Sequence, residues 1–210
     1  MKVISTNIGN PTAIKWNGRT IKTGIYKYPI EGSIVLQKEE VENDTIIDRK
    51  NHGGIYKACY LFSTDNYDFW KDKYPNLDWD WGMFGENLSI NSLDESQIRI
   101  GDIYKLGSAL VQVTQPREPC FKLGIRFKNQ EVLKQFIEHE KPGVYVKVLK
   151  EGSVSCGDFL ELKEQSTNTL TVKQFYQLLY MRKKDSDLVK LAISNKALPL
   201  YKREYLEKFL

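Results

Sequence analysis

Short runs of β-forming residues, separated at close intervals by Gly, Asn, Asp or Pro, dominate the chain from Lys2 to about Leu162. In order, these runs read KVIST, TGIYKYPI, SIVLQ, DIYKLGSALVQVT, GVYVKVL and DFLELK. Closely spaced strands of this kind are typical of a barrel or sandwich rather than of strand–helix–strand units. We therefore predict a mainly β domain, with hairpins around Gly107 and Gly152.

Two helices are predicted within this β-rich region. Ser63 or Thr64 can cap the stretch DNYDFWKDKY, and EVLKQFIEHE spaces its apolar residues at helical intervals before Pro142 and Gly143. The expected class is therefore α+β, dominated by strands.

The pattern becomes helical after about Ser166. Thr171 and Gln174 form a capping box at the start of VKQFYQLLYM, Asp185 or Ser186 can cap DLVKLAIS, and Pro199 can open LYKREYLEKFL. We predict two domains, a β-barrel domain over residues 1–165 and a three-helix extension over 166–210. In the last helix an apolar stripe should pack on the barrel or on a partner; it comprises Tyr201, Tyr205, Leu206 and Phe209.

The charge balance of the 210-residue chain restricts its partners. With 41% hydrophobic and 28% charged residues the chain should fold, and 31 Lys and Arg against 27 Asp and Glu give only +4. This excess fits an anionic small ligand but is weak for nucleic acid, and the basic residues of the tail are interleaved with acids. The N-terminus has no apolar core of a signal peptide, and no apolar run approaches the roughly 18 residues of a membrane span. We expect a cytoplasmic protein.

The three cysteines are widely spaced and contain no CxxC pair, so neither a disulfide framework nor a structural zinc site is indicated. Cys59 and Cys156 sit among strand-forming residues and are expected to be small buried hydrophobes. Cys120 differs, because it lies in QPREPCFKLGIRF between two prolines and a phenylalanine. The prolines predict a stiff loop just past a strand.

Basic side chains surround Cys120 in the sequence. Arg117, Lys122 and Arg126 lie within six residues of it, and nearby cations favour the thiolate form, which is a nucleophile and a soft metal ligand. An ordinary loop cysteine with incidental basic neighbours is an equally open interpretation of this stretch alone.

The chain has only two histidines that could assist a thiolate. His139 is expected to end a helix and to interact with the helix dipole. His52 precedes Gly53 and Gly54, and paired glycines let backbone N–H groups approach a ligand closely. His52-Gly53-Gly54 is therefore either an anion-accepting turn or a plain tight turn.

Two further stretches carry polar groups next to glycines. In WDWGMFGENLSI, Glu86 and Asn87 offer donors and acceptors to a heteroatom-rich ring system, although a capping turn explains the same residues. In IKTGIYKYPIEG, Lys22, Thr23 and Lys27 surround a glycine and form either a phosphate contact or a solvated hairpin face.

Together these stretches resemble the MOSC family, named after the C-terminal domain of molybdenum cofactor sulfurase. TGIYKYP, NHGGIYKACY, FGENLSI, IGDIYKLG and QPREPCFKL occur in the family's order over almost the whole chain, followed by the helical tail of a stand-alone bacterial branch. The resemblance implies a β-barrel that binds molybdenum through its pyranopterin cofactor, with Cys120 as the protein ligand to the metal.

The resemblance also implies the residues that contact the cofactor. Next to the cysteine they are Arg117 and Lys122, in the HGG motif His52, Gly53 and Gly54, in the FGEN motif Phe84, Gly85, Glu86 and Asn87, and in a looser stretch Thr23 and Lys27.

The same branch includes reductases of N-hydroxylated bases such as 6-hydroxylaminopurine. The resulting hypothesis is that a molybdenum centre takes the oxygen atom from an N–OH substrate and that the oxygen leaves as water. A separate reductase must supply electrons, because the chain has no dinucleotide fingerprint, no Walker A loop and no iron–sulfur spacing. The competing hypothesis is a non-catalytic carrier of the cofactor or of sulfur. The tail is expected to be either structural or a docking surface for the electron donor or for a second copy in a homodimer.

Overall fold

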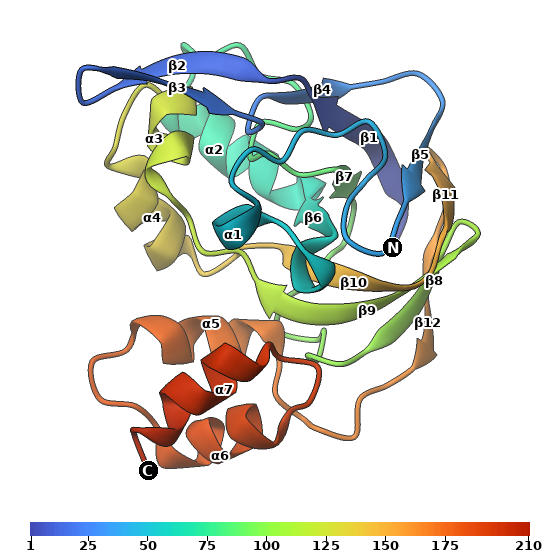
Figure 1. The fold of residues 1–210 in the computed structure, drawn as a ribbon, viewed down its shortest axis with the longest axis vertical. Coiled ribbons are helices and arrows are strands. Elements are labelled where there is room, and N and C mark those ends of the chain that lie inside the picture. Colours follow the sequence, from blue (N-terminus) through green and yellow to red (C-terminus); the bar gives the residue numbers. More distant parts are fainter.

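The computed structural model describes all 210 residues and is built around one twisted sheet of eight strands (Figure 1). The strand order is β12-β8-β9-β10-β6-β7-β1-β4, and only the β6–β7 pair is parallel. The strands are β1 (Val3–Gly9), β4 (Lys27–Pro29), β6 (Cys59–Ser63), β7 (Leu88–Ile90), β8 (Ile103–Leu106), β9 (Ala109–Pro116), β10 (Val144–Lys150) and β12 (Leu160–Glu164).

Two small antiparallel pairs stand beside this sheet. One is the hairpin of β2 (Thr12–Trp16) and β3 (Arg19–Thr23), and the other joins β5 (Ser33–Leu36) to β11 (Gly152–Ser155). The predicted hairpin at Gly107 is confirmed by the β8–β9 pairing. The hairpin predicted at Gly152 is wrong, because β11 leaves β10 and pairs with the distant β5.

The predicted barrel is not confirmed, although the α+β class is. The ordered ladders end at β12 and β4, and β12 is connected to the start of the chain only through an isolated bridge between Lys2 and Phe159 and adjacent backbone hydrogen bonds. A continuous ladder would be needed for closure. The sheet is therefore strongly curved around its core but open.

Both predicted internal helices are present, as α2 (Tyr67–Lys73) and α4 (Val132–His139). The capping prediction for the first is wrong, because a 3₁₀ turn over Thr64–Asn66 precedes α2 and neither Ser63 nor Asn66 makes a side-chain cap. Two short helices were not predicted, α1 (Arg49–His52) and α3 (Phe121–Arg126), and a further 3₁₀ turn covers Ile55–Lys57.

The three predicted tail helices are confirmed as α5 (Val172–Tyr180), α6 (Ser186–Ser194) and α7 (Leu200–Glu207). Thr171 and Gln174 form the capping box, and Asp185 caps α6. The helices gather below β9 in Figure 1, and α5 contacts that strand. No helix of the chain combines the length and the apolar character that crossing a bilayer requires.

The packing of the tail differs from the predicted apolar stripe. Of the four stripe residues only Leu206 is buried, whereas Tyr201 and Tyr205 are 59% and 54% exposed. The tail instead shares one 31-residue hydrophobic cluster with the sheet, in which Phe175 and Leu198 lie with Val111 and Val113. The division into two domains stays a prediction, although this shared core ties the helices firmly to the sheet.

A second, aromatic cluster of 11 buried residues lies under α2, α3 and α4, with Trp70, Phe84 and Phe136 fully buried. His139 ends α4 as predicted, but its ring stacks on Phe69 at 4.1 Å and burial lowers its pKa to about 4. It is neutral at pH 7 and cannot act as the charged partner of the helix dipole that we expected. Cys59 is buried as predicted, whereas Cys156 is exposed in a turn, which corrects that prediction.

The buried carboxyl group of Glu95 makes folding stability depend on pH. Its Oε1 accepts a hydrogen bond from the Gly143 backbone N–H at 2.8 Å, and burial raises its pKa to about 7. Above pH 4.5 the unfolded chain releases this proton while the folded chain keeps it, so stability falls as the pH rises toward 7.

We expect Glu95→Gln to remove this pH-dependent loss, which is on the order of 3 kcal/mol at pH 8. Thermal unfolding of both proteins at pH 5 and pH 8 checks this: the variant should gain stability over the parent mainly at pH 8. An equal difference at both pH values would show that Glu95 does not carry a raised pKa.

Candidate functional site

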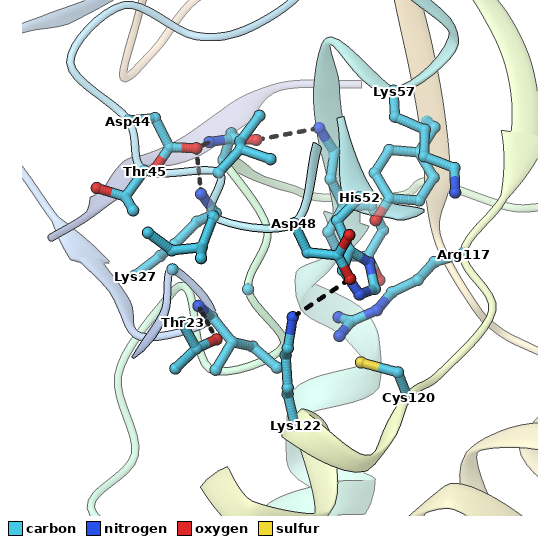
Figure 2. Close-up of a pocket in the computed structure, with 18 residues that line it drawn as sticks. Thr23, Lys27, Asp44, Thr45, Asp48, His52, Lys57, Arg117, Cys120 and Lys122 are labelled. Atoms are coloured by element: carbon cyan, nitrogen blue, oxygen red, sulfur yellow. Dashed lines mark hydrogen bonds and ion pairs between the residues drawn. The ribbon is translucent and has the colours of Figure 1, made fainter. Parts of the chain in front are cut away.

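A cavity of roughly 580 Å³, counting its open mouth, lies between the loops at one end of the sheet (Figure 2). The 18 residues that line it come from five parts of the chain: the β3–β4 connection, the segment 44–48, the region from His52 to Tyr60, the FGEN loop, and the PREPC loop with the facing strand β10. The site is thus assembled from segments that are far apart in the sequence.

Cys120 lines this cavity and is half-buried. Strand β9 ends at Pro116, so Cys120 lies just past a strand, as the two prolines predicted; that α3 begins at the next residue, Phe121, was not predicted. Its carbonyl accepts a hydrogen bond from the Leu123 backbone N–H at 2.8 Å, which fixes the turn. The thiol is therefore held on a short, restrained connection between a strand and a helix.

Arg117 is buried beside Cys120 without any acidic partner. Its guanidinium lies over the rings of Tyr60 and Phe136, at 5.1 and 5.9 Å from their centroids, and its buried Nη1 atom makes no hydrogen bond. A buried polar atom without a partner costs free energy and is rare in folded proteins. Because Arg117 lines the cavity, an anion bound there would supply the missing acceptor.

Lys122 and His52 face the same part of the cavity (Figure 2). Lys122 Nζ lies 3.9 Å from Asp48 Oδ2, and the Asp48 side chain also caps α1 by accepting from the Asn51 N–H. Burial, followed by the charges of Lys122 and Arg117, lowers the pKa of His52 to about 4. His52 is therefore neutral at pH 7 and offers one donor and one acceptor to a ligand.

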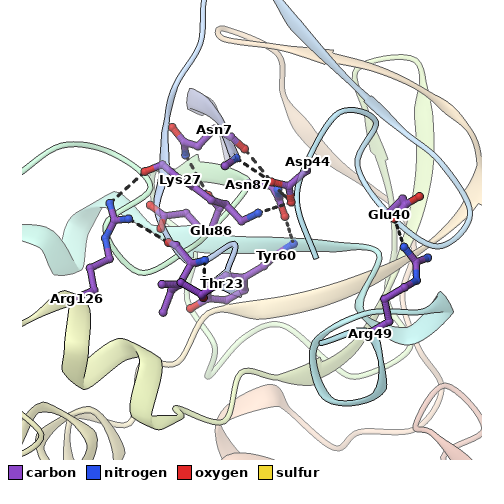
Figure 3. Close-up of polar contacts among 12 residues, drawn as sticks. Asn7, Thr23, Lys27, Glu40, Asp44, Arg49, Tyr60, Glu86, Asn87 and Arg126 are labelled. Atoms are coloured by element: carbon purple, nitrogen blue, oxygen red, sulfur yellow. Dashed lines mark hydrogen bonds and ion pairs between the residues drawn. The ribbon is translucent and has the colours of Figure 1, made fainter. Parts of the chain in front are cut away.

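The other end of the cavity holds a buried ion pair that sequence reasoning missed (Figure 3). Asp44 Oδ2 accepts hydrogen bonds from Lys27 Nζ and, at 2.9 Å, from Asn87 Nδ2, while Oδ1 accepts from the Gly9 N–H at 2.9 Å. The Asp44 side chain is only 2% exposed. Burial lowers the pKa of Lys27, and Asp44 opposes this effect.

Asp44 thereby orients two of the predicted cofactor contacts, Lys27 and Asn87. Asn87 is further fixed because its Oδ1 accepts from the Tyr60 N–H at 3.2 Å. The only local signal for Asp44 is its place in the polar stretch ENDT, which reads as a turn. Its partners lie far away in the sequence, so nothing near it indicates a buried role.

The predicted site residues divide into those that line the cavity and those that do not. Lining it are Thr23, Lys27, His52, Gly85, Asn87, Arg117, Cys120 and Lys122. Gly53, Gly54, Phe84 and Glu86 are outside the lining. Phe84 lies in the aromatic cluster, and Gly54 has the positive φ of 85° that the HGG turn requires.

Arg126 also lies behind the cavity rather than in it. Its guanidinium donates to the carbonyls of Ile25 and Lys27 at 3.0 and 3.1 Å and supports the β3–β4 connection from below (Figure 3). Lys22, from the same predicted stretch, is exposed and does not line the cavity.

The Glu86 carboxylate makes its hydrogen bonds to groups inside the protein and not to the cavity. Oε1 accepts from the Gly82 N–H and the Ser89 hydroxyl, both at 2.9 Å, and from the Tyr67 hydroxyl, while Oε2 accepts from the Phe84 N–H at 3.1 Å. Glu86 therefore holds the FGEN loop in shape, so that Gly85 and Asn87 reach the cavity.

We expect Glu86→Gln to destabilise the fold by roughly 1–3 kcal/mol, because the new amide N–H₂ must face hydrogen-bond donors. Chemical denaturation measures this loss. Glu31→Gln, the same change at an exposed carboxylate, is the control and should leave the midpoint unchanged. A Glu86→Gln protein of parental stability would contradict the structural role of this carboxylate.

The charges and the thiol define the kind of ligand that this cavity suits. Four cations line it, Lys27, Lys57, Arg117 and Lys122, against two carboxylates, and Cys120 adds a soft ligand atom. The chain has no cluster of three His, Cys, Asp or Glu side chains that could hold a metal ion by itself. The site is thus of the kind that binds an anionic ligand next to one protein sulfur.

The chain belongs to the MOSC domain family, whose model matches residues 48–161. It is 35% identical to the uncharacterized protein YflK of Bacillus subtilis over 93% of this chain and 88% of that protein. It is also 36% identical to a protein named reductase from Gibberella moniliformis, over 70% of this chain but only 27% of the fungal protein. The crystal structure of YiiM from Geobacillus stearothermophilus superposes with a TM-score of 0.83 at 29% identity, over 100% of this chain and 98% of that one.

Proposed function

We propose that this chain is a cytoplasmic, molybdenum-cofactor-dependent reductase of N-hydroxylated bases or related N-hydroxylated compounds. Membership of the MOSC family, which is associated with the molybdenum cofactor, and the fungal relative named reductase both support an oxidoreductase. The observation that carries the proposal is the buried, unpartnered Arg117 Nη1 next to the Cys120 thiol in one cavity. A phosphorylated cofactor with a metal centre would satisfy both groups.

The residues that line the cavity fit the two ends of such a cofactor. Cys120 would hold the molybdenum through its sulfur, which must be deprotonated when bound. Arg117 and Lys122 would contact the phosphate, because guanidinium and ammonium groups are the usual phosphate partners in proteins. At the far end, Asn87 and Thr23 line the cavity and would offer a polar ring the hydrogen-bonding capacity that their internal contacts leave over.

When bound, the cofactor supplies the two-electron chemistry that reduces an N–OH bond. The balance is R–NHOH + 2H⁺ + 2e⁻ → R–NH₂ + H₂O, so the site must also admit protons. His52 lines the cavity and is neutral at pH 7, so its ring can donate a hydrogen bond to the substrate hydroxyl without bringing a further positive charge. Tyr60 and Tyr145 keep their hydroxyl protons, because burial raises the pKa of both.

A reduction assay tests the proposal. Protein produced in a cofactor-synthesising host, with molybdenum content confirmed, is mixed with an N-hydroxylated base and dithionite with methyl viologen as the artificial donor. We expect stoichiometric conversion to the amine. Loaded protein that converts no N-hydroxylated compound would refute the reductase and favour the carrier of cofactor or sulfur.

A further inference from the structure

The most exposed apolar surface of the molecule lies on the tail. Six of the 12 exposed large hydrophobic side chains are there, and we call them the tail face: Tyr180, Leu200, Tyr201, Tyr205, Phe209 and Leu210. Their exposed fractions run from 38% to 68%. Clustered aromatic side chains that remain exposed are typical of surfaces that bind another protein.

The tail face borders the loop that carries Cys120. Lys202 of α7 is almost buried over the Phe175 ring and forms an ion pair with Glu118, two residues before Cys120. Tyr201 and Tyr180 also lie near Glu118. Burial raises the pKa of each tyrosine, and the negative charge of Glu118 raises it further. A protein seated on the tail face would therefore lie next to the only cysteine of the cavity.

The charge of the tail indicates what such a protein is like. Residues 166–210 contain nine Lys and Arg against four Asp and Glu, a net charge of +5 in a chain whose total is +4. The rest of the chain is thus close to neutral. Arg182 and Lys183, next to Tyr180, are exposed and form no ion pair. Complementary charge speeds association and selects partners, so an acidic partner is favoured.

The tail is also rigid where it meets the rest of the molecule. Its apolar residues share the 31-residue cluster with the sheet, and Lys184 Nζ donates to the carbonyls of Leu178 and Leu179 at 2.7 and 3.0 Å, which closes the end of α5. A docking face on such a support needs little ordering when a partner binds.

We propose that the tail face docks an acidic electron-donor protein that delivers electrons to the Cys120 site. This inference rests on the proposed function, because the reduction of R–NHOH consumes two electrons for which the chain shows no internal donor motif. The donor is oxidised as the cofactor is reduced, and the protons come from solvent.

The probe is a flavodoxin, a strongly acidic one-electron flavoprotein, titrated in its oxidised form into the purified chain at about 50 and about 300 mM salt. We expect saturable binding that weakens with salt. The double variant Tyr201→Ser/Tyr205→Ser should raise Kd at least about tenfold, as should Arg182→Glu/Lys183→Glu. Matched controls are Phe159→Ser, 56% exposed elsewhere, and Lys15→Glu/Arg19→Glu on the exposed β2–β3 hairpin, which should bind as the parent does.

Turnover separates this inference from the function on which it rests. With reduced flavodoxin as donor the tail variants should lose at least about tenfold in rate, and with dithionite and methyl viologen they should match the parent. Absence of binding to the parent, or equal Kd for tail variants and controls, overturns the docking surface. A tail variant whose only effect is to convert a dimer into a monomer also overturns the proposal, because the tail face would then join two copies of the chain. Failure of dithionite-driven turnover in every protein instead refutes the reductase, and the binding titration still decides the surface.

Discussion

Cys120→Ala protein, purified from a cofactor-producing host, is expected to retain less than about a tenth of the molybdenum found in the parent. Cys120 is the only cysteine that lines the cavity. The lysine and arginine side chains around it are positively charged and cannot coordinate a metal cation in its place. Loss of the sulfur should abolish reduction of N-hydroxylated bases as well. Elemental analysis together with the dithionite-driven assay measures both effects.

Cys156→Ala is the matched control for this prediction, because Cys156 is a free cysteine that lies exposed in a turn outside the cavity. It should keep both metal and activity. The thermal stability of Cys120→Ala should stay near that of the parent, since the half-buried side chain makes no hydrogen bond through sulfur. Molybdenum and activity retained in Cys120→Ala would remove Cys120 as the metal ligand.

Asp44→Ala should cost about 3 kcal/mol of unfolding free energy, because it leaves Lys27 buried without its counter-ion and removes the acceptor of Asn87 and Gly9. The same change should release Lys27 and Asn87 from their orientation and lower cofactor retention. Denaturant titration and molybdenum content measure the two effects separately.

Asp48→Ala is the comparison for this second prediction. Asp48 also lines the cavity, but its side chain is 35% exposed and its ion pair with Lys122 spans 3.9 Å. A long, partly exposed pair contributes about 1 kcal/mol or less, and the loss of the Asp48 cap on α1 adds about 1 kcal/mol. If Asp44→Ala were no more destabilising than Asp48→Ala, the buried pair of Asp44 and Lys27 would not be the support that its contacts indicate.

Three local signals in the sequence predicted local structure correctly, whereas the cap predicted at Ser63 or Thr64 does not form. The Thr171–Gln174 capping box, the cap at Asp185 and the prolines around Cys120 each act over a few residues, and each has the expected effect in the structure. The hairpin of β2 and β3 was equally accessible, because Asn17-Gly18 with positive φ at both residues is a strong hairpin turn, but it was not among the predicted strands.

Features that depend on distant segments were not predictable in the same way. Strand β11 follows β10 directly, yet it pairs with β5, more than a hundred residues earlier. Sequence order favours neighbouring strands, and no local residue marks this exception. The apolar stripe predicted on α7 was wrong for a related reason. An amphipathic pattern does not say which of its residues will face the core.

The candidate site shows the same difference between local signals and contacts with distant segments. The motifs around Cys120, His52 and Asn87 were singled out from residue types, and the fold brings them to one cavity. Glu86 belongs to the same motif as Asn87, yet its carboxylate is satisfied inside the loop. Asp44 was missed because a buried partner of Lys27 and Asn87 can be recognised only after the chain has folded.

Molybdenum K-edge absorption spectroscopy of the loaded protein tests most directly whether position 120 supplies a ligand to the metal. Parent and Cys120→Ser proteins are reconstituted with the same cofactor, and the sulfur coordination of the metal is compared. We expect one sulfur fewer around molybdenum in the serine variant. Identical sulfur coordination in the two proteins would contradict it.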